Sequence, residues 1–341
     1  MRSNLRIALA FIALAGVIVA DNSAAQRPPA QVKKLTWRLA SSQNPTHPIG
    51  QAYKKFADNV SEATRNTSEQ IEVLVYPAGQ LFAIGQLHAA VTAGQVQLAE
   101  IVPSFATGRA PSLSVSDLPF LWPSTQVLWK ALDGEYGKLW AGELEKEGKV
   151  KNLAFIDVGD VNLFIANRPV RTPADIKGLK LRLPGKYYSL WGKELGVQPV
   201  TISGNEALAA IQSGTLDGHI TADALYIDRK QYEAAPYVTL FLISTYTYML
   251  GVNQNAWDSL SEDTRQALAK AAKQAQADLR AVMLKTANDY RQQMRSIAKV
   301  TELTPKQQAD WEATGKPIWD QFLADIPSGR ALLNAALAAR K

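Results

Sequence analysis

The sequence predicts an α/β protein with two lobes, and three observations indicate this fold class. Runs with the period of β-strands alternate with runs of helical period, which is typical of a mainly parallel sheet covered by helices. The strand-like runs are numerous for one sheet, so two lobes are expected. Two breaks in the pattern, at 156–161 and 244–248, are the expected crossings between the lobes.

The strand-like runs are 35–41, 71–76, 96–102, 150–157, 161–167, 179–183, 216–221 and 238–242. In the run 179–183, three leucines alternate with Lys180 and Arg182, and Pro184 ends the strand because it has no N–H for the ladder. The helix-like runs are 49–64, 84–93, 126–146, 186–195, 206–212 and 224–233.

One long amphipathic helix is expected after the second crossing. Ser261 supplies its N-cap, and Glu262 and Asp263 supply an acidic first turn. Roughly 36 residues at ~1.5 Å each give about 54 Å, which is longer than one small domain is wide. Helical spacing is shown by Leu268, Ala272, Ala275, Leu279, Val282, Tyr290, Met294 and Ile297. A helix under both lobes is expected, with a coiled-coil dimer as the alternative.

The first 25 residues predict a cleaved signal peptide and therefore export to the periplasm. Arg2 and Arg6 precede an apolar run at 7–20 of about 14 residues, which is short of the roughly 20 that a membrane helix needs. Small residues at 23–25 offer a cleavage site. An uncleaved anchor is the alternative. No cysteine follows the run, which argues against a lipid anchor.

Composition and motifs favour a binding protein over an enzyme or a nucleic-acid partner. The chain has no cysteine and a formal charge of +6, and its basic residues are scattered, which disfavours nucleic acid and suits an anionic solute. None of its three histidines has metal-ligand spacing, and it has neither a nucleophile elbow nor a phosphate loop. No cofactor and no metal are therefore expected.

Residues at strand ends are the candidate binding groups, because ligands bind at the carboxyl ends of strands in doubly wound folds. Arg182 lies at such an end, and its guanidinium matches a carboxylate in geometry and charge. An exposed surface arginine is the alternative. The other candidates at strand ends, near a crossing or in the return segment are Ser41, Ser104, Phe105, Asn162, His219, Thr221 and Tyr246. Core packing is the alternative for Phe105, Thr221 and Tyr246.

The segment Thr172-Pro-Ala-Asp-Ile-Lys-Gly-Leu-Lys-Leu-Arg-Leu-Pro184 resembles a signature of the solute-binding subunits of TRAP transporters, the DctP-like family. Further matches lie in order along the chain, two before this segment at 76–81 and 117–121 and two after it at 209–218 and 258–263. The resemblance implies a two-lobed periplasmic-binding-protein fold, a long helix spanning both lobes, and a ligand carboxylate bound by the arginine that matches Arg182.

Departures from this family bear on the substrate. Sialic-acid-binding members have a second arginine at the position of Asn162, an asparagine at Thr221 and a phenylalanine at Gly204, while Phe82 stands where the family usually has glycine. Asn162 brings no charge, and Gly204 and Phe82 suggest room and a wall for an apolar body. A monocarboxylate is therefore expected rather than a dicarboxylate.

The sequence thus predicts a monomeric, exported receptor that binds a small organic acid and delivers it to TRAP permease subunits in the membrane. Lobe I is expected to comprise 34–159 and 248–287, and lobe II 160–247 and 288–341. The alternatives are a receptor that presents its solute to a sensor kinase and, on the same scaffold, an exported hydrolase.

Overall fold

A computed structural model describes residues 32–340; the expected signal peptide at 1–25 lies outside the described residues. In the described part, nine strands form one sheet in the order β2-β1-β3-β8-β4-β7-β5-β6, with β9 paired to β8. The strands are β1 (Lys33–Ala40), β2 (Glu69–Tyr76), β3 (Leu98–Ile101), β4 (Val150–Ile165), β5 (Lys180–Arg182), β6 (Gln198–Val200), β7 (Gly218–Ala222), β8 (Tyr237–Asn253) and β9 (Lys299–Glu302).

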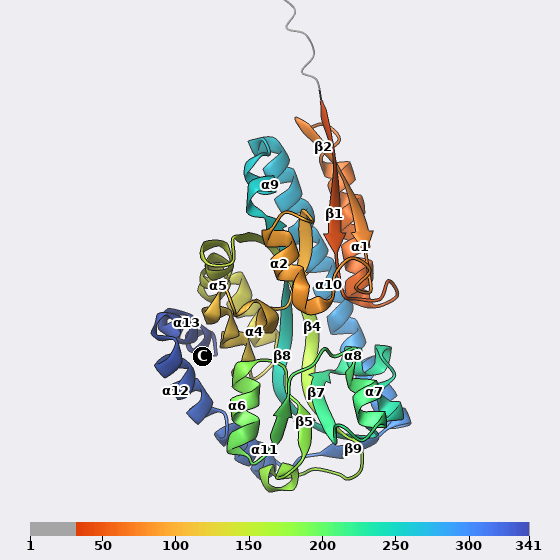
Figure 1. The fold of residues 1–341 in the computed structure, drawn as a ribbon, viewed down its shortest axis with the longest axis vertical. Helices are drawn as coiled ribbons and strands as arrows, with labels where there is room; N and C mark the ends of the chain where they lie inside the picture. The colour runs from red at the N-terminus through yellow and green to blue at the C-terminus, as the bar shows by residue number, and fades with distance from the viewer. Residues whose placement is uncertain (1–31, 341) are drawn as a thin grey trace, which may run out of the picture. The chain divides into compact units, whose positions relative to one another are not determined.

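The sheet is mixed, with antiparallel pairs at its centre and parallel pairs toward its ends. β3 pairs antiparallel with β8, and β4 pairs antiparallel with both β8 and β7. The pairs β1–β2, β1–β3, β5–β7 and β5–β6 are parallel. The fold is the two-lobed α/β fold that the sequence predicts: one lobe holds β1 to β3, the other holds β5 to β7, and β4 and β8 belong to both (Figure 1).

The two long central strands correct the expected breaks at 156–161 and 244–248. The chain does not leave the sheet at either place, because β4 continues through the first and β8 through the second. Instead, the β4–β8 register shifts between Asp157 and Gly159, and Gly159 has φ 102°. A glycine in the left-handed region forms a bulge that bends a strand without ending it.

Helices cover the sheet, and most lie where the sequence predicts them. They are α1 (Pro48–Ala63), α2 (Leu87–Thr92), α3 (Pro103–Ala106), α4 (Thr125–Asp133), α5 (Glu135–Lys146), α6 (Lys186–Glu194), α7 (Ala207–Gln212), α8 (Asp223–Asp228), α9 (Gln254–Asp258), α10 (Glu262–Ile297), α11 (Pro305–Ala313), α12 (Lys316–Asp325) and α13 (Arg330–Ala339). The single helix expected at 126–146 is two, because Gly134 adopts a non-helical conformation between α4 and α5. The helix expected at 224–233 ends early, since Lys230 has φ 50°.

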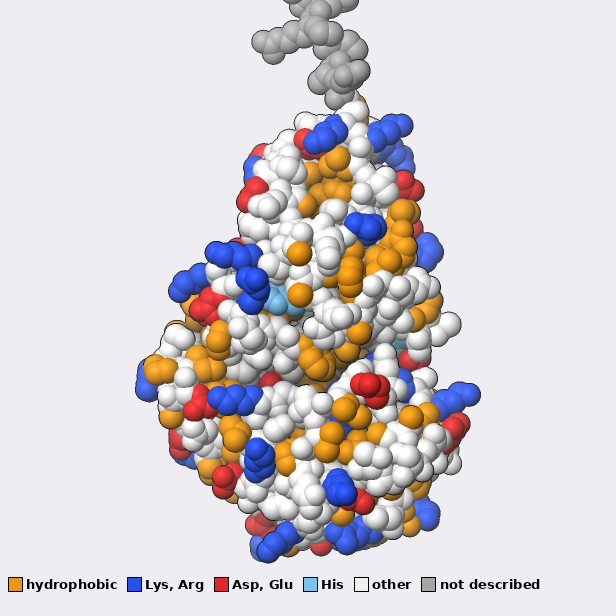
Figure 2. All heavy atoms as spheres, viewed as in Figure 1, with side chains coloured by type: hydrophobic (Ala, Val, Ile, Leu, Met, Phe, Trp, Pro, Cys, Tyr) orange, Lys and Arg blue, Asp and Glu red, His pale blue; other side chains and the backbone are white. Residues whose placement is uncertain are grey.

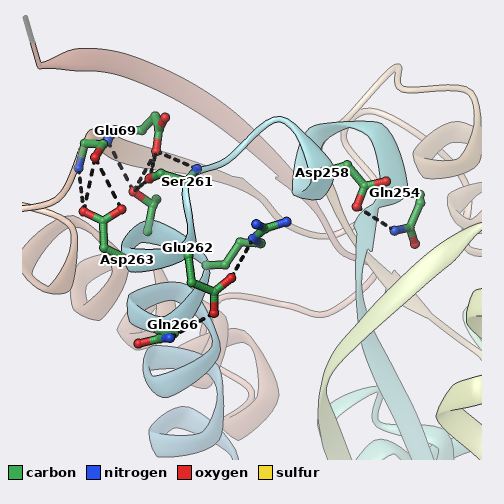
Figure 3. Close-up of polar contacts among 10 residues, drawn as sticks. Glu69, Gln254, Asp258, Ser261, Glu262, Asp263 and Gln266 are labelled. Carbon is green, nitrogen blue, oxygen red and sulfur yellow. Dashed lines mark hydrogen bonds and ion pairs between the residues drawn. The ribbon is translucent and has the colours of Figure 1, made fainter.

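Helix α10 has 36 residues, as the periodicity predicts, and it follows Ser261. Its apolar face contributes Leu268 and Leu279 to one hydrophobic core and Met294 to another, so the helix supports both lobes. The Ser261 hydroxyl does not cap the helix but donates to the carboxylate of Glu69 on β2 (Figure 3). This carboxylate also accepts a hydrogen bond from the Ser261 backbone N–H, the bond that the N3 side chain makes in a capping box.

On the face drawn in Figure 2, Lys and Arg side chains are scattered among acidic, apolar and neutral ones and form no continuous stripe. Among the described residues, none of the helices combines the length and the apolar character that crossing a membrane requires.

Candidate functional site

Arg182 ends strand β5 and is only 5 % exposed. Its Nε donates to the Ile202 carbonyl at 3.1 Å and its Nη1 to the Ile220 carbonyl at 2.9 Å. These carbonyls lie just after β6 and on β7, the two strands that flank β5. The two bonds fix the plane of the guanidinium. Its Nη2 has no hydrogen-bond partner among residues 32–340 and remains available as a donor.

A cavity lies in front of this guanidinium. Its wall includes six of the sequence-predicted binding residues, namely Ser104, Phe105, Arg182, Gly204, Thr221 and Tyr246. They come from α3, β5, β7, β8 and the loop before α7, so the fold gathers residues more than 140 positions apart. The centre of a water molecule can move through about 30 Å³ of this cavity. That is room for a few water molecules, so a larger ligand requires the walls to separate.

A second arginine, Arg229, lines the same cavity although the sequence pattern does not reveal it. A Cβ atom on Gly204 would collide with Nη1 of Arg229 and lie 3.6 Å from Nη2 of Arg182, so both guanidinium groups approach Gly204. Within the described range neither arginine belongs to an ion pair. Burial lowers the pKa of Arg182, and the charge of Arg229 contributes to this shift. An anion stabilises two cations that repel each other where one is buried and the other partly buried.

Asp117 adds an acidic group to the wall of this cavity. Its Oδ1 accepts hydrogen bonds from the hydroxyls of Ser104 at 2.6 Å and Ser116 at 3.3 Å. Burial raises the pKa of Asp117 to about 7, against the effect of these two hydroxyls. The site therefore combines two cationic groups with one carboxyl that gains a proton easily near neutral pH.

Four sequence-predicted residues do not line this cavity, and each has a structural reason. Ser41 donates its hydroxyl to Oε2 of Glu100 at 3.2 Å and belongs to a buried polar cluster around that carboxylate. Phe82 packs against the hydrophobic core from a loop. His219 is fully buried beside Arg182, its register partner across β5 and β7, and its ring packs at a tilt against Phe164. Burial and the neighbouring Arg182 lower its pKa well below the ordinary value, which keeps it neutral.

Asn162 is the fourth, and its side chain holds the backbone of β8. Its Oδ1 accepts hydrogen bonds from the N–H groups of Phe241 at 2.9 Å and Leu242 at 3.1 Å, and its Nδ2 donates to Asp223. Leu242 has φ 47°, so these bonds secure a bulge in the strand. The missing charge at Asn162 therefore carries no argument about the cavity at Arg182.

Two of the larger hollows, of about 440 and 390 Å³, share Asp160 and Arg291 in their walls. Two of the three arginines in these walls are paired, Arg291 with Asp160 at 2.7 Å and Arg295 with Glu302 at 2.6 Å, and the third, Arg340, donates to two backbone carbonyls. Since charges paired within the protein offer little to an anion, the smaller cavity at Arg182 is the stronger candidate for an anion site. Within 32–340, no group of three or more His, Cys, Asp or Glu side chains is arranged to hold a metal ion.

Comparison with known proteins finds the family described as "Bacterial extracellular solute-binding protein, family 7" over residues 39–325. The chain is 29% identical over 303 residues to the C4-dicarboxylate-binding periplasmic protein DctP of Rhodobacter capsulatus, covering 87% of this chain and 89% of that protein.

Two similar solved structures are TRAP periplasmic solute-binding proteins. That from Chromohalobacter salexigens, with bound D-glucuronate, has a TM-score of 0.83 at 26% identity and covers 89% of this chain and 99% of its own. That from Sulfurospirillum deleyianum, with bound succinate, has a TM-score of 0.82 at 25% identity and covers 90% of this chain and 99% of its own.

Proposed function

Because the chain belongs to family 7 of the bacterial extracellular solute-binding proteins, the receptors of TRAP transporters, we propose that it binds an organic acid anion between its lobes and delivers it to a TRAP membrane permease. Receptors of this family bind small organic acids and are not enzymes. Beyond membership of this family, we propose which residues bind the ligand, how many carboxylates the ligand carries and how the protein reaches the periplasm.

The observation that carries the proposal is that the guanidinium groups of buried Arg182 and partly buried Arg229 meet at one cavity. Arg182 has a donor left over after its two bonds to backbone carbonyls, and the Arg229 guanidinium makes no hydrogen bond within the described part of the chain. A carboxylate supplies two oxygens and a negative charge, which match two such donors. Thr221 and Tyr246 complete the polar wall, and Phe105 provides an apolar surface.

The ligand we propose is a monocarboxylate. Asp117 lines the cavity, so above its pKa of about 7 a second carboxylate placed near it would meet a negative charge rather than a cation. A dicarboxylate is the second candidate, and Arg229 favours it, because two arginines can serve two carboxylates. The Rhodobacter capsulatus relative described as binding C4-dicarboxylates points the same way.

Export follows from the same proposal. Residues 1–25 act as a cleaved signal peptide, and the mature protein works as a monomer in the periplasm, without nucleic acid. Lobe I comprises 34–159 with 248–287, and lobe II comprises 160–247 with 288–341. The strand pairing supports this division. The end of β8, at 249–252, pairs with β3 of lobe I, and the end of β4, at 161–165, pairs with β7 of lobe II.

The test is Arg182→Ala, with isothermal titration of D-glucuronate, succinate and simple monocarboxylates. Removing one partner of a buried charge pair typically loses ~2–5 kcal/mol, on the order of 30-fold or more in affinity. Arg330→Ala removes the same charge from an exposed helix position and should leave affinity unchanged. Equal affinity of the Arg182 variant and the parent protein would remove this cavity as the binding site. Native mass spectrometry of the purified protein would identify any acid that co-purifies.

A further inference from the structure

Asp117 has one oxygen that the protein itself does not use. The residue ends the 3₁₀ segment Pro111–Asp117 and is 1 % exposed. While Oδ1 accepts two serine hydroxyls, Oδ2 is buried and has no hydrogen-bond partner in the described range 32–340. A buried acceptor left without a donor is costly, so a donor from the cavity would be bound favourably.

The backbone leaves little space for a protein side chain to fill this role. Gly185, between β5 and α6, packs directly against the carboxyl of Asp117, and a Cβ atom there would collide with Oδ2. Gly185 also has φ 90°, which a residue with a side chain rarely adopts. Gly185 therefore packs against the free oxygen, and Asp117 itself belongs to the wall of the cavity.

Tyr246 links this oxygen to the arginine end of the cavity. Its hydroxyl is buried and also has no partner in the described part of the chain. Burial raises its pKa, the Arg182 guanidinium lowers it, and the Asp117 carboxylate raises it further. Tyr246 is thus close enough to both charged groups for each to shift its pKa, and all three residues line the same cavity.

We propose that Asp117 binds a hydroxyl group of the ligand, which makes the substrate a hydroxy acid. This rests on the proposed function: the carboxylate binds at Arg182 and Arg229, and a hydroxyl elsewhere on the molecule donates to Oδ2. An ammonium group could donate as well, but two nearby arginines repel a cation. A site built to bind a hydroxyl rejects an analogue that lacks it, because the acceptor is then left unpaired.

The experiment compares the full-length mature protein with Asp117→Asn by titration of D-glucuronate, 3-hydroxybutyrate and its deoxy counterpart butyrate. Asparagine has the same shape, keeps one oxygen for the serine hydroxyls and places an N–H₂ donor where Oδ2 was. Asp289→Asn removes the same charge from an exposed position on helix α10 and serves as the control. If Asp117→Asn does not fold, Ser104→Ala takes its place, since it removes the 2.6 Å bond that orients the carboxyl.

In the parent protein, a hydroxy acid should bind more tightly than butyrate. Asp117→Asn should weaken the hydroxy acids by about tenfold or more, leave butyrate unchanged and so reduce the discrimination between them. The role of Asp117 is overturned if the variant discriminates between hydroxy acid and butyrate as the parent does, or if the parent binds butyrate more tightly. In either case, the proposed function still stands if acid binding depends on Arg182. Binding of none of these acids, nor of any in a wider organic-acid panel, overturns both.

Discussion

At the scale of single residues, the two arginines at the cavity differ in how visible they are in the sequence. Arg182 is predictable because it ends a short alternating strand before a proline. Arg229 lies in a charged run with Asp228 and Lys230 after a helix, a pattern that usually indicates a solvated surface. Its partial burial results from packing between segments distant in the sequence, which a local pattern does not reveal. Both assignments stay predictions until binding is measured.

Gly204 lines the candidate site, as the sequence predicts, but for a different structural reason. The sequence suggests that it leaves room for the ligand, whereas the structure shows that it leaves room for Arg229. We predict that Gly204→Ala displaces the Arg229 guanidinium and lowers acid affinity by about tenfold, since roughly 1–2 kcal/mol of charged hydrogen bonding is lost. Stability should change little, because the displaced atom is the end of a flexible side chain.

Titration and thermal unfolding of this variant measure the two effects separately. Gly142→Ala is the matched control, because its Cβ would meet nothing within 4 Å and it lies in helix α5. It should keep its affinity and gain about 1 kcal/mol in stability. Full affinity in Gly204→Ala would show that Arg229 does not take part.

Asp157 allows a prediction about pH that is independent of the binding site. Burial, with a contribution from Asp160, raises its pKa in the folded protein to about 7. The folded state therefore holds this proton more tightly than the unfolded state, whose pKa is about 3.9. This contribution to stability is complete below pH ~4 and is lost as the pH rises to about 7.

We predict that Asp157→Asn, which cannot titrate, becomes more stable relative to the parent protein between pH 5 and pH 8. The difference should change by at most about 1.4 kcal/mol per pH unit. Urea unfolding at the two pH values measures it. Other buried carboxyls such as Asp117 titrate in both proteins and cancel in the difference. A difference that is the same at both pH values would contradict the shift.

At the scale of helices and strands, the sequence predicts those elements whose signal is long and local. Helix α10 follows from its periodicity and its acidic first turn. The sequence predicts breaks within β4 and β8 because glycine and polar residues interrupt the apolar pattern there. Hydrogen bonding across the sheet nevertheless keeps both strands continuous. The sequence does not predict the short strands β6 and β9, because three or four residues are too few to show the alternation of a strand.

The start of α10 gives a prediction at this scale. Glu69 of β2 accepts hydrogen bonds from the hydroxyls of Ser261 and Thr264 and from the Ser261 N–H, and thereby ties the helix to the edge of the sheet (Figure 3). Partial burial opposes the lowering of its pKa, but these bonds outweigh it. Glu69→Ala should lower the free energy of unfolding by about 1–3 kcal/mol at neutral pH.

Because the folded pKa of Glu69 is lowered, its contribution is present above the unfolded value of about 4.3 and is lost as the pH falls through the folded value. The cost of Glu69→Ala should accordingly shrink in acid. Glu72→Ala on the same strand is the control, since Glu72 is exposed, and it should be nearly neutral. Equal losses in the two variants would mean that the contacts at the helix start are not stabilising.

At the scale of the whole molecule, the family comparison confirms the prediction of a TRAP solute receptor with a two-lobed fold. That prediction came from short motifs whose order and spacing match the family, and it covers most of the chain. The identity of the solute is not accessible in the same way. It depends on which side chains line one cavity. Arg229 lines the cavity at Arg182 although the sequence does not predict it, whereas Asn162 is bonded to Asp223 away from this cavity.

The small volume at Arg182 requires a movement of the lobes. About 30 Å³ cannot admit an organic acid, so the protein must open for the ligand to enter and close around it. Strands β4 and β8 and helix α10 connect the lobes, and Gly159 in β4, at φ 102° beside a register shift, is a position where bending is easy. Closure would exclude water and strengthen the ion pairs with the arginines.

We therefore predict that a saturating acid ligand reduces the radius of gyration measured by small-angle X-ray scattering. The free protein should scatter as a mixture that includes a more open form, and the bound protein as the compact form alone. In Arg182→Ala the same acid should cause no contraction, because closure is driven by contacts that only the bound carboxylate makes across the cleft. If the free and bound curves of the parent protein coincide at saturation, the lobes do not close on the ligand, and the acid must enter by local movement of the cavity wall instead.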